Sequence, residues 1–141
     1  MASAKEIEEG NQIRLKLNNS GMLPVVTTDA NSKEVLMIAY MNQEAFDLSV
    51  ETGEAHYYSR SRKKIWRKGE TSGFIQKIKE IKTDCDQDAI WLSVEMVGGA
   101  CCHVGYKSCF YRKVVKDSSG GVALEFTESE KKYDPKKIYK K

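Results

Sequence analysis

The pattern of apolar and polar positions predicts a chain made mainly of short strands. Residues 23–28 carry four consecutive β-branched side chains, which favour a strand. Pro24 has no backbone N–H, so its place near the start of this strand predicts an edge position in the sheet. Residues 34–41 form a nearly continuous apolar run, which predicts a second strand buried on both faces.

One helix is predicted directly after that run, over residues 42–52. Asn42 is suited to the N-cap because its side chain can accept a hydrogen bond from the first turn. Ala45, Phe46 and Leu48 give the helix an apolar face. Gly53 stands where a helix commonly ends in a left-handed residue.

The remaining pattern predicts further strands and a basic loop. Strands are expected at residues 55–59, 74–82 and 89–97, and a final hairpin at 110–115 and 122–126, with a basic loop at 60–73. A weak helical or strand-like piece is expected near residues 13–17. The resulting fold class is α+β with a mainly antiparallel sheet, in a single domain spanning residues 1–141. We expect its lysine-rich tail, about residues 128–141, to be a solvated, poorly ordered end.

Composition and charge narrow the class of protein. The chain of 141 residues is 40% hydrophobic and 30% charged, as in ordinary globular proteins. It has neither an apolar run long enough to span a membrane nor an apolar signal core near Met1, so we expect a soluble cytoplasmic protein with reduced thiols. A net charge of only +3 argues against a dedicated nucleic-acid binder.

An acidic segment with a cysteine in its middle offers the first candidate chemistry. In an extended chain, Asp84, Asp86 and Asp88 would share one face and Cys85 would point to the other. Three carboxylates on one face suit a hard cation such as Mg²⁺, whereas a thiolate suits a softer metal such as Zn²⁺. The plain alternative is a solvated acidic turn around a buried cysteine.

A glycine-rich segment later in the chain adds two more thiols. Cys102 and Cys109, with Cys85, make three sulfur ligands. Three protein ligands leave one zinc position for water, which points to a catalytic rather than a structural site. His103 is either a fourth ligand or a proton-transfer group, and its place beside Cys102 favours the latter. Cys101 is assigned to packing.

The basic loop has the residue types that bind a phosphorylated ligand. Its arginines and lysine can hold phosphate, its glycine admits close backbone approach, its tryptophan offers a plane for a base, and its hydroxyls and carboxylate can hydrogen-bond. The candidate binding residues are Arg60, Arg62, Trp66, Arg67, Lys68, Gly69, Glu70, Thr71 and Ser72. Single-stranded nucleic acid is recognised by similar residue types, and a solvated basic hairpin is the plain alternative.

Taken together, these segments resemble the phosphoribosyl-AMP cyclohydrolase family. The matching stretches are residues 66–73, 84–89 and 100–110, in that order, and the resemblance covers about residues 20–115. Cys101 is an extra cysteine ahead of the family's Cys-His pair. The chain ends soon after the last stretch, so the resemblance is to the monofunctional form.

The resemblance implies a specific reaction and assembly. The reaction is hydrolytic opening of the adenine ring of phosphoribosyl-AMP between N1 and C6, in the third step of histidine biosynthesis. The assembly is an intertwined homodimer in which Cys85 of one subunit joins Cys102 and Cys109 of the other on zinc. The three aspartates match the family's magnesium positions, and His103 is our candidate for proton transfer.

Two rival functions use similar residues. A zinc base deaminase also attacks a ring carbon, but its H-x-E and P-C-x-x-C elements are not found in this sequence. A zinc-stabilised nucleic-acid-binding module would close the metal site with protein ligands and show no turnover.

Overall fold

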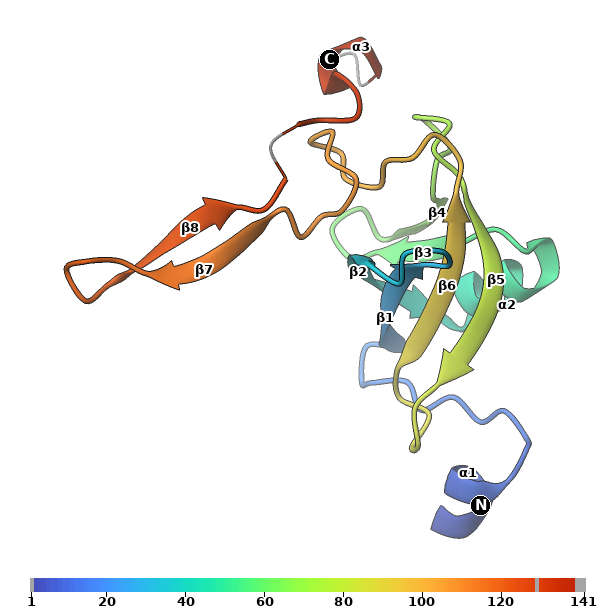
Figure 1. The fold of residues 1–141 in the computed structure, drawn as a ribbon. Coiled ribbons are helices and arrows are strands. Elements are labelled where there is room, and N and C mark those ends of the chain that lie inside the picture. Colours follow the sequence, from blue (N-terminus) through green and yellow to red (C-terminus); the bar gives the residue numbers. More distant parts are fainter. Residues whose placement is uncertain (1, 129, 139–141) are drawn as a thin grey trace.

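The computed structural model describes residues 2–128 and 130–138, and it is built around one four-stranded sheet (Figure 1). The strand order is β2-β1-β6-β5. These strands are β1 (Met22–Asp29), β2 (Val35–Asn42), β5 (Gln76–Thr83) and β6 (Ile90–Met96). All neighbours are antiparallel except β1 and β6, which run parallel. The predicted α+β class with mainly antiparallel pairing is thus confirmed, while the parallel pair was not foreseen.

The prediction that Pro24 marks an edge strand is wrong. β1 pairs with β2 on one side and with β6 on the other, so it is a central strand. The proline is tolerated because the ladder with β6 begins one residue later, at Val25 opposite Ile90. At Pro24 itself only β2 lies alongside, with Tyr40 as the partner. The missing N–H therefore lies at a level of the sheet that β6 has not yet reached, so no hydrogen bond to β6 is lost.

The prediction that residues 34–41 are buried on both faces is also wrong. β2 is itself an edge strand, and the side chain of Ile38 is 58% exposed. Leu36 and Met41 face the core and are buried. Continuous apolarity therefore reflects one face in the core and one face that is only partly covered, by Arg60 over Tyr40.

Helix α2 (Gln43–Thr52) begins and ends where the sequence predicts. Asn42 caps it by accepting a hydrogen bond from the N–H of Ala45 at 2.8 Å. Gly53 ends it in the left-handed conformation, with a φ of 73°. The helix packs against β2 and β3 (His56–Ser59), and Phe46 joins the hydrophobic core there.

The predicted basic loop contains a strand. β4 (Lys64–Arg67) pairs with β3 in a separate antiparallel hairpin, so only its flanks are irregular. The rings of Tyr57 in β3 and Trp66 in β4 lie 5.3 Å apart across the hairpin, and Tyr57 is buried in the core, which attaches the hairpin to it. Lys64 and Arg67 are thereby held on a strand, while the other basic residues of this segment lie in its irregular flanks.

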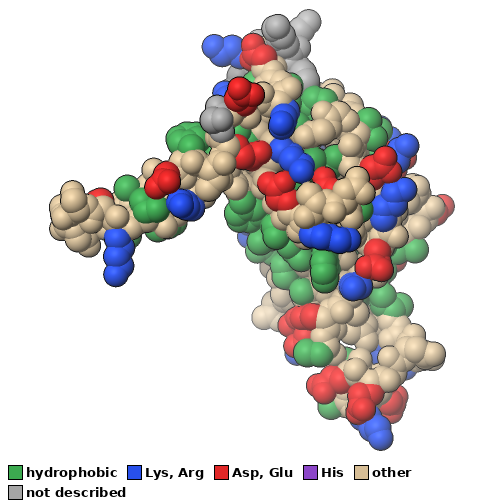
Figure 2. All heavy atoms as spheres, viewed as in Figure 1, with side chains coloured by type: hydrophobic (Ala, Val, Ile, Leu, Met, Phe, Trp, Pro, Cys, Tyr) green, Lys and Arg blue, Asp and Glu red, His purple; other side chains and the backbone are tan. Residues whose placement is uncertain are grey.

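The ends of the chain extend away from this body. The predicted final hairpin is confirmed as β7 (Arg112–Lys116) and β8 (Val122–Phe126), which we call the arm. The arm stands clear of the body, as Figures 1 and 2 show. Two short helices, α1 (Ala4–Glu9) and α3 (Pro135–Ile138), lie near the termini, and neither was predicted. None of the described helices has the length and apolarity to cross a membrane.

Candidate active site

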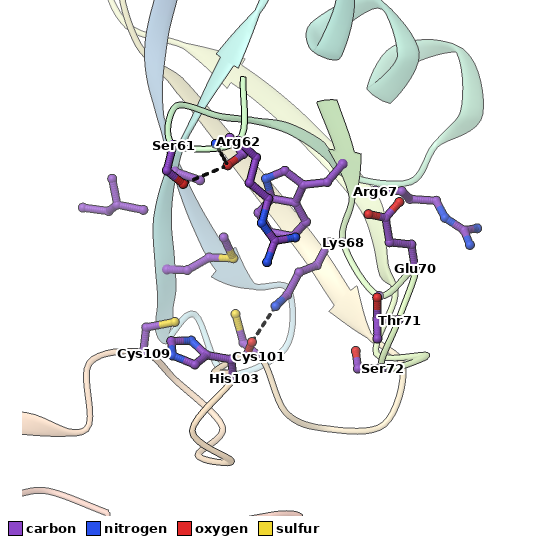
Figure 3. A pocket seen from close by; sticks show the side chains of 16 residues that line it. Ser61, Arg62, Arg67, Lys68, Glu70, Thr71, Ser72, Cys101, His103 and Cys109 are labelled. Atoms are coloured by element: carbon purple, nitrogen blue, oxygen red, sulfur yellow. Dashed lines mark hydrogen bonds between the residues drawn. The ribbon is translucent and has the colours of Figure 1, made fainter. Parts of the chain in front are cut away.

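A cavity of about 830 Å³ lies between three segments of the described chain. Strand β2 supplies one wall, the β3–β4 hairpin and the loop after it supply the second, and the segment carrying His103 and the later cysteines supplies the floor. Figure 3 shows the basic side chains above the thiols across this space. The fold thus brings two of the three sequence motifs together.

Two thiols, those of Cys101 and Cys109, lie at the floor of the cavity, and that of Cys102 lies just outside its lining. The thiol of Cys109 hydrogen-bonds with those of Cys101 and Cys102. The hydrogen bond with Cys101 is the main cause that raises the pKa of Cys109 to about 12, and the hydrogen bond with Cys109 together with burial raises the pKa of Cys102. The same contact with Cys109 lowers the pKa of Cys101. A metal that binds Cys102 and Cys109 at neutral pH must therefore displace their protons.

Residues 101–109, which we call the thiol segment, are hydrogen-bonded to the edge strand β2. The N–H of Cys109 donates to the carbonyl of Leu36 at 2.7 Å, and the hydroxyl of Ser108 donates to the carbonyl of Val35 at 2.8 Å. Within the segment, the N–H of Cys102 donates to the carbonyl of Tyr106 at 3.1 Å. Because Ser108 is buried, these bonds fix the cysteines on the sheet rather than on a free loop.

Lys68 links the basic wall to the thiol floor. Its ammonium donates to the carbonyl of Cys101 at 2.6 Å, and the residue is only 9% exposed. The sequence assigned Lys68 to substrate phosphate, and its position in the cavity allows that contact. Its positive charge also lies near the thiols, where it lowers the pKa of Cys101 after the larger effect of Cys109.

Most of the predicted binding residues line the cavity. They are Arg62, Trp66, Arg67, Lys68, Gly69, Glu70, Thr71 and Ser72. Arg60 is not among the lining residues, and its guanidinium lies 4.0 Å above the ring of Tyr40. Arg67 forms an ion pair with Glu54 at 3.1 Å, so its charge is partly engaged outside the cavity.

Gly69 is required by the backbone of this wall. Its φ is 93°, and a Cβ added there would lie 2.6 Å from the amide nitrogen of Ile75. Any other residue would therefore be strained and would displace the following strand. The close approach shapes the turn that presents Glu70, Thr71 and Ser72 to the cavity.

His103 lies at the open side of the thiol floor. It lines the cavity, and Figure 3 shows its imidazole beside the side chains of Cys101 and Cys109. The residue is exposed, so its ring is free to meet a ligand that fills the cavity. This position suits a group that transfers a proton to or from the ligand.

The three predicted aspartates do converge, although the chain there is not extended. Single carboxylate oxygens of Asp84, Asp86 and Asp88 all lie within 4.8 Å of one another. The segment is a turn between β5 and β6, in which Asp84 accepts the N–H of Asp88 at 3.0 Å. Hydrogen bonds with Asp84 and Asp86 raise the pKa of Asp88 to about 6. Crowded carboxylates of this kind fit a hard cation.

Gln87 holds that turn in place, a role that the sequence did not indicate. It has a φ of 59° and is buried. Its side-chain carbonyl accepts the N–H of Arg14 at 2.6 Å, and its amide donates to the carbonyl of Gln12 at 3.3 Å. The N–H of Lys16 donates to the carbonyl of Gln87 at 2.7 Å. Residues 12–16 of the N-terminal segment therefore hold the acidic turn in place through hydrogen bonds with Gln87.

Cys85 does not meet the other cysteines in this chain. It is exposed in the acidic turn, at one end of β6, while the thiol segment follows the other end (Figure 1). Seven strand residues separate the two ends, or about 23 Å at ~3.3 Å per residue. Cys85 therefore cannot join Cys102 and Cys109 on one metal ion within a single chain.

The tail and strand β2 add contacts that the sequence did not indicate. The predicted solvated tail packs on the thiol segment at its start, where Tyr133 donates to the carbonyl of Cys102 at 2.7 Å and Lys132 donates its N–H to Gly105 at 2.6 Å. Lys140 and Lys141 lie outside the described residues.

Met37 and Ile38 of β2 also line the cavity. The sequence did not indicate them as site residues, because an apolar run of this kind is typical of any strand in a protein core.

Comparison with known proteins identifies the family of this chain. The family model described as phosphoribosyl-AMP cyclohydrolase matches residues 37–111. A phosphoribosyl-AMP cyclohydrolase of Rhodopseudomonas palustris is 54% identical over 136 residues, which cover 96% of this chain and 90% of that protein. One of Nitrobacter winogradskyi is 50% identical over 138 residues, or 98% of this chain and 94% of that protein. The chain therefore belongs to the phosphoribosyl-AMP cyclohydrolase family.

Proposed function

We propose that this protein is a phosphoribosyl-AMP cyclohydrolase of histidine biosynthesis. It hydrolyses the N1–C6 bond of the adenine ring of 1-(5-phosphoribosyl)-AMP and yields the formimino-aminoimidazole carboxamide ribotide. The observation that carries the proposal is the cavity itself, in which the thiol of Cys109 and the imidazole of His103 face a basic wall. The thiol of Cys102 lies next to that of Cys109, just outside the lining. We place the enzyme in the cytoplasm, where thiols stay reduced.

Cys102 and Cys109 are proposed to hold the catalytic zinc. When bound, zinc supplies the Lewis acidity that makes water nucleophilic near neutral pH. His103 then moves the proton that N1 needs as the C6–N1 bond breaks, because an unprotonated ring nitrogen is a poor leaving group. The ammonium of Lys68 donates to the carbonyl of Cys101 at 2.6 Å and so keeps the thiol segment in contact with the basic wall of the cavity during the reaction.

The basic wall is proposed to bind the two phosphates and the ring system of the substrate. Arg62 and Lys68 line the cavity, and they supply the positive charge that phosphate requires. The hydroxyls of Thr71 and Ser72 lie on the same wall and can donate further hydrogen bonds. Trp66 offers an apolar plane for the base. Arg60, which stacks on Tyr40, is proposed to act from outside the cavity.

The acidic turn is proposed to bind Mg²⁺ through Asp84, Asp86 and Asp88. Their oxygens converge without a compensating positive side chain in the cluster that the described residues form. Protonation of Asp88, whose pKa is about 6, competes with the cation. Magnesium binding should therefore weaken as the pH falls through that value.

The zinc site is proposed to be completed by Cys85 of a second copy of this chain. Cys85 is exposed on the acidic turn, at the far end of β6 from Cys102. A thiol that cannot reach the site of its own chain can reach that of a neighbour in a two-fold dimer, which would then hold two equal sites. The magnesium turn would lie beside each zinc site for the same reason.

The arm is proposed to form part of this dimer contact. It is a two-stranded hairpin with no third strand in the described chain, and such hairpins are marginal when isolated. Val114 and Leu124 face each other across it and are 71% and 55% exposed. β7 begins three residues after Cys109, so a partner that covers the arm also comes close to the zinc ligands.

A charge on the apolar side of the arm should weaken the dimer. We expect Leu124→Asp to cost about 3 kcal/mol of association, or roughly 100-fold, since it removes a buried leucine and buries a carboxylate. Light scattering over a dilution series measures the change. Ser118→Asp adds the same charge at the exposed tip of the arm and should leave the dimer intact. Equal dissociation constants for the two variants would remove the arm from the interface.

A direct assay tests the proposed activity. Purified protein should consume phosphoribosyl-AMP and produce the absorbance of the opened ring, a zinc chelator should stop the reaction, and added zinc should restore it. Zinc-loaded protein that leaves the substrate unchanged would overturn the proposal, and it would favour a zinc-stabilised nucleic-acid-binding module instead.

A further inference from the structure

The extra cysteine of this chain lies against a proposed zinc ligand. Cys101 is buried, but its side chain lines the same cavity as that of the exposed Cys109. The two thiols are close enough for each to shift the pKa of the other. Figure 3 shows the sulfurs of Cys101 and Cys109 at the floor of the cavity, near the two ends of the thiol segment.

A buried polar network holds the sulfur of Cys101 in this position. The amide of Gln76 donates to that sulfur at 3.5 Å, and the carbonyl of Gln76 accepts the hydroxyl hydrogen of Tyr57 at 2.6 Å. Tyr57 in turn lies 2.7 Å from the hydroxyl of Thr27 in the central strand. All of these partners are fully buried, so the Cys101 side chain is oriented by the core rather than by the loop.

Cys102 is placed differently although it is the next residue. Its sulfur accepts the N–H of Val104 at 3.4 Å and is not part of the cavity lining. Cys85 lies at the opposite end of β6. Among the four cysteines, Cys101 and Cys109 are therefore the two that share contact with each other and access from the cavity.

We propose that Cys101 and Cys109 form a reversible disulfide when the protein meets a peroxide. This site of oxidation goes beyond the proposed activity, while its consequence for zinc rests on the proposed role of Cys109. A sulfur in a disulfide is no longer a thiolate ligand, so closing the link releases the metal and stops turnover. A dithiol reductant reopens it.

The chemistry balances with hydrogen peroxide as the oxidant. Peroxide that enters the cavity meets Cys109, which lines it and which, as a metal ligand, would be held as the nucleophilic thiolate. One peroxide oxygen is transferred to that sulfur to give a sulfenic acid, and with one proton the other oxygen leaves as water. The thiol of Cys101 then attacks the oxidised sulfur, the S–S bond forms, and a second water leaves. Two thiols and one peroxide thus give one disulfide and two waters.

The experiment compares the wild-type holoenzyme with Cys101→Ser and Cys101→Ala under limiting hydrogen peroxide. We expect the wild type to lose about 2 Da, to yield a peptide that links residues 101 and 109, and to release zinc to a chromophoric chelator. Both variants should release zinc at least about ten-fold more slowly, since a serine or alanine cannot close the link. Dithiothreitol and fresh zinc should restore the wild type, with activity expressed relative to each untreated protein.

Three results would overturn the inference. They are a link that maps to Cys102 and Cys109, oxidation of Cys109 to a sulfinic acid without any link in the wild type, and equal rates of zinc release in all three proteins. The mapped link does not depend on turnover. A protein that forms it but never hydrolyses phosphoribosyl-AMP would contradict the proposed function and leave the disulfide standing.

Discussion

Cys109→Ala is expected to remove zinc and activity together. Changes to groups that merely support a metal ligand cost ~10- to 100-fold in metal affinity, so the loss of a ligand should cost at least ~100-fold. Activity should fall by at least the same factor because the nucleophile depends on the metal. Metal analysis of the purified variant and a zinc titration followed by the phosphoribosyl-AMP assay measure both quantities.

Cys101→Ala is the matched control for that loss. It removes one sulfur from the same floor of the cavity, next to Cys109, but from a residue that we assign to packing. The control should keep its zinc and fold normally, since the change empties little volume. Equal zinc loss in both variants would show that Cys101 is a ligand, and zinc retention by Cys109→Ala would remove Cys109 from the metal site.

His103→Ala is expected to lower kcat by ~10²- to 10⁴-fold, the usual contribution of a general acid or base. The fall corresponds to about 3–5 kcal/mol of transition-state stabilisation. Zinc content should stay full, because His103 is assigned to proton transfer rather than to the metal. The expected signature is therefore a low kcat in a protein that still holds its metal.

His56→Ala is the control, since His56 is the other histidine of this chain. It lies half-buried in β3, and its ring nitrogen Nδ1 is 2.9 Å from the carbonyl of Glu54, away from the cavity lining. The control should keep its kcat. An unchanged kcat in His103→Ala would refute the proton-transfer role, and a loss of zinc there would make His103 a ligand.

The local parts of the fold were predictable because their signals lie within a few residues. Asn42 starts the helix through a hydrogen bond of its side chain, and Gly53 ends it because a residue without a Cβ readily adopts the left-handed conformation. The arm hairpin was similarly visible from a glycine-containing turn between two short apolar runs. The sheet order was not, because pairing between strands far apart in sequence leaves no local pattern.

Pro24 and Ile38 show how that missing information misled the prediction. The properties of both residue types were interpreted correctly: proline lacks the backbone N–H, and isoleucine favours an apolar strand. Whether a strand is central or at an edge depends on its neighbours, and β1 gained β6 as a parallel neighbour from 60 or more residues away. The edge assignments of β1 and β2 were consequently exchanged.

The candidate site was predictable in its residues but not in its arrangement. The sequence indicated the thiols, the acidic turn and the basic loop from their chemistry, and the fold brings the basic loop to His103 and Cys109. It could not indicate that Gln87 straps the acidic turn or that Lys68 contacts Cys101, since these depend on contacts across the fold. The distance between Cys85 and Cys109 was implied only by the family resemblance.

The central claim is that phosphoribosyl-AMP is hydrolysed at a zinc site that two chains build together. Its most direct test mixes two variants, Cys85→Ala and Cys109→Ala, after partial unfolding and refolding that exchanges their subunits. Each variant alone should lack zinc and activity. In the mixture, half of the dimers pair unlike chains and each of these regains one complete site, so about a quarter of wild-type activity and zinc should return. A mixture as inactive as its parents, or a Cys85→Ala variant that is fully active alone, would contradict the shared site.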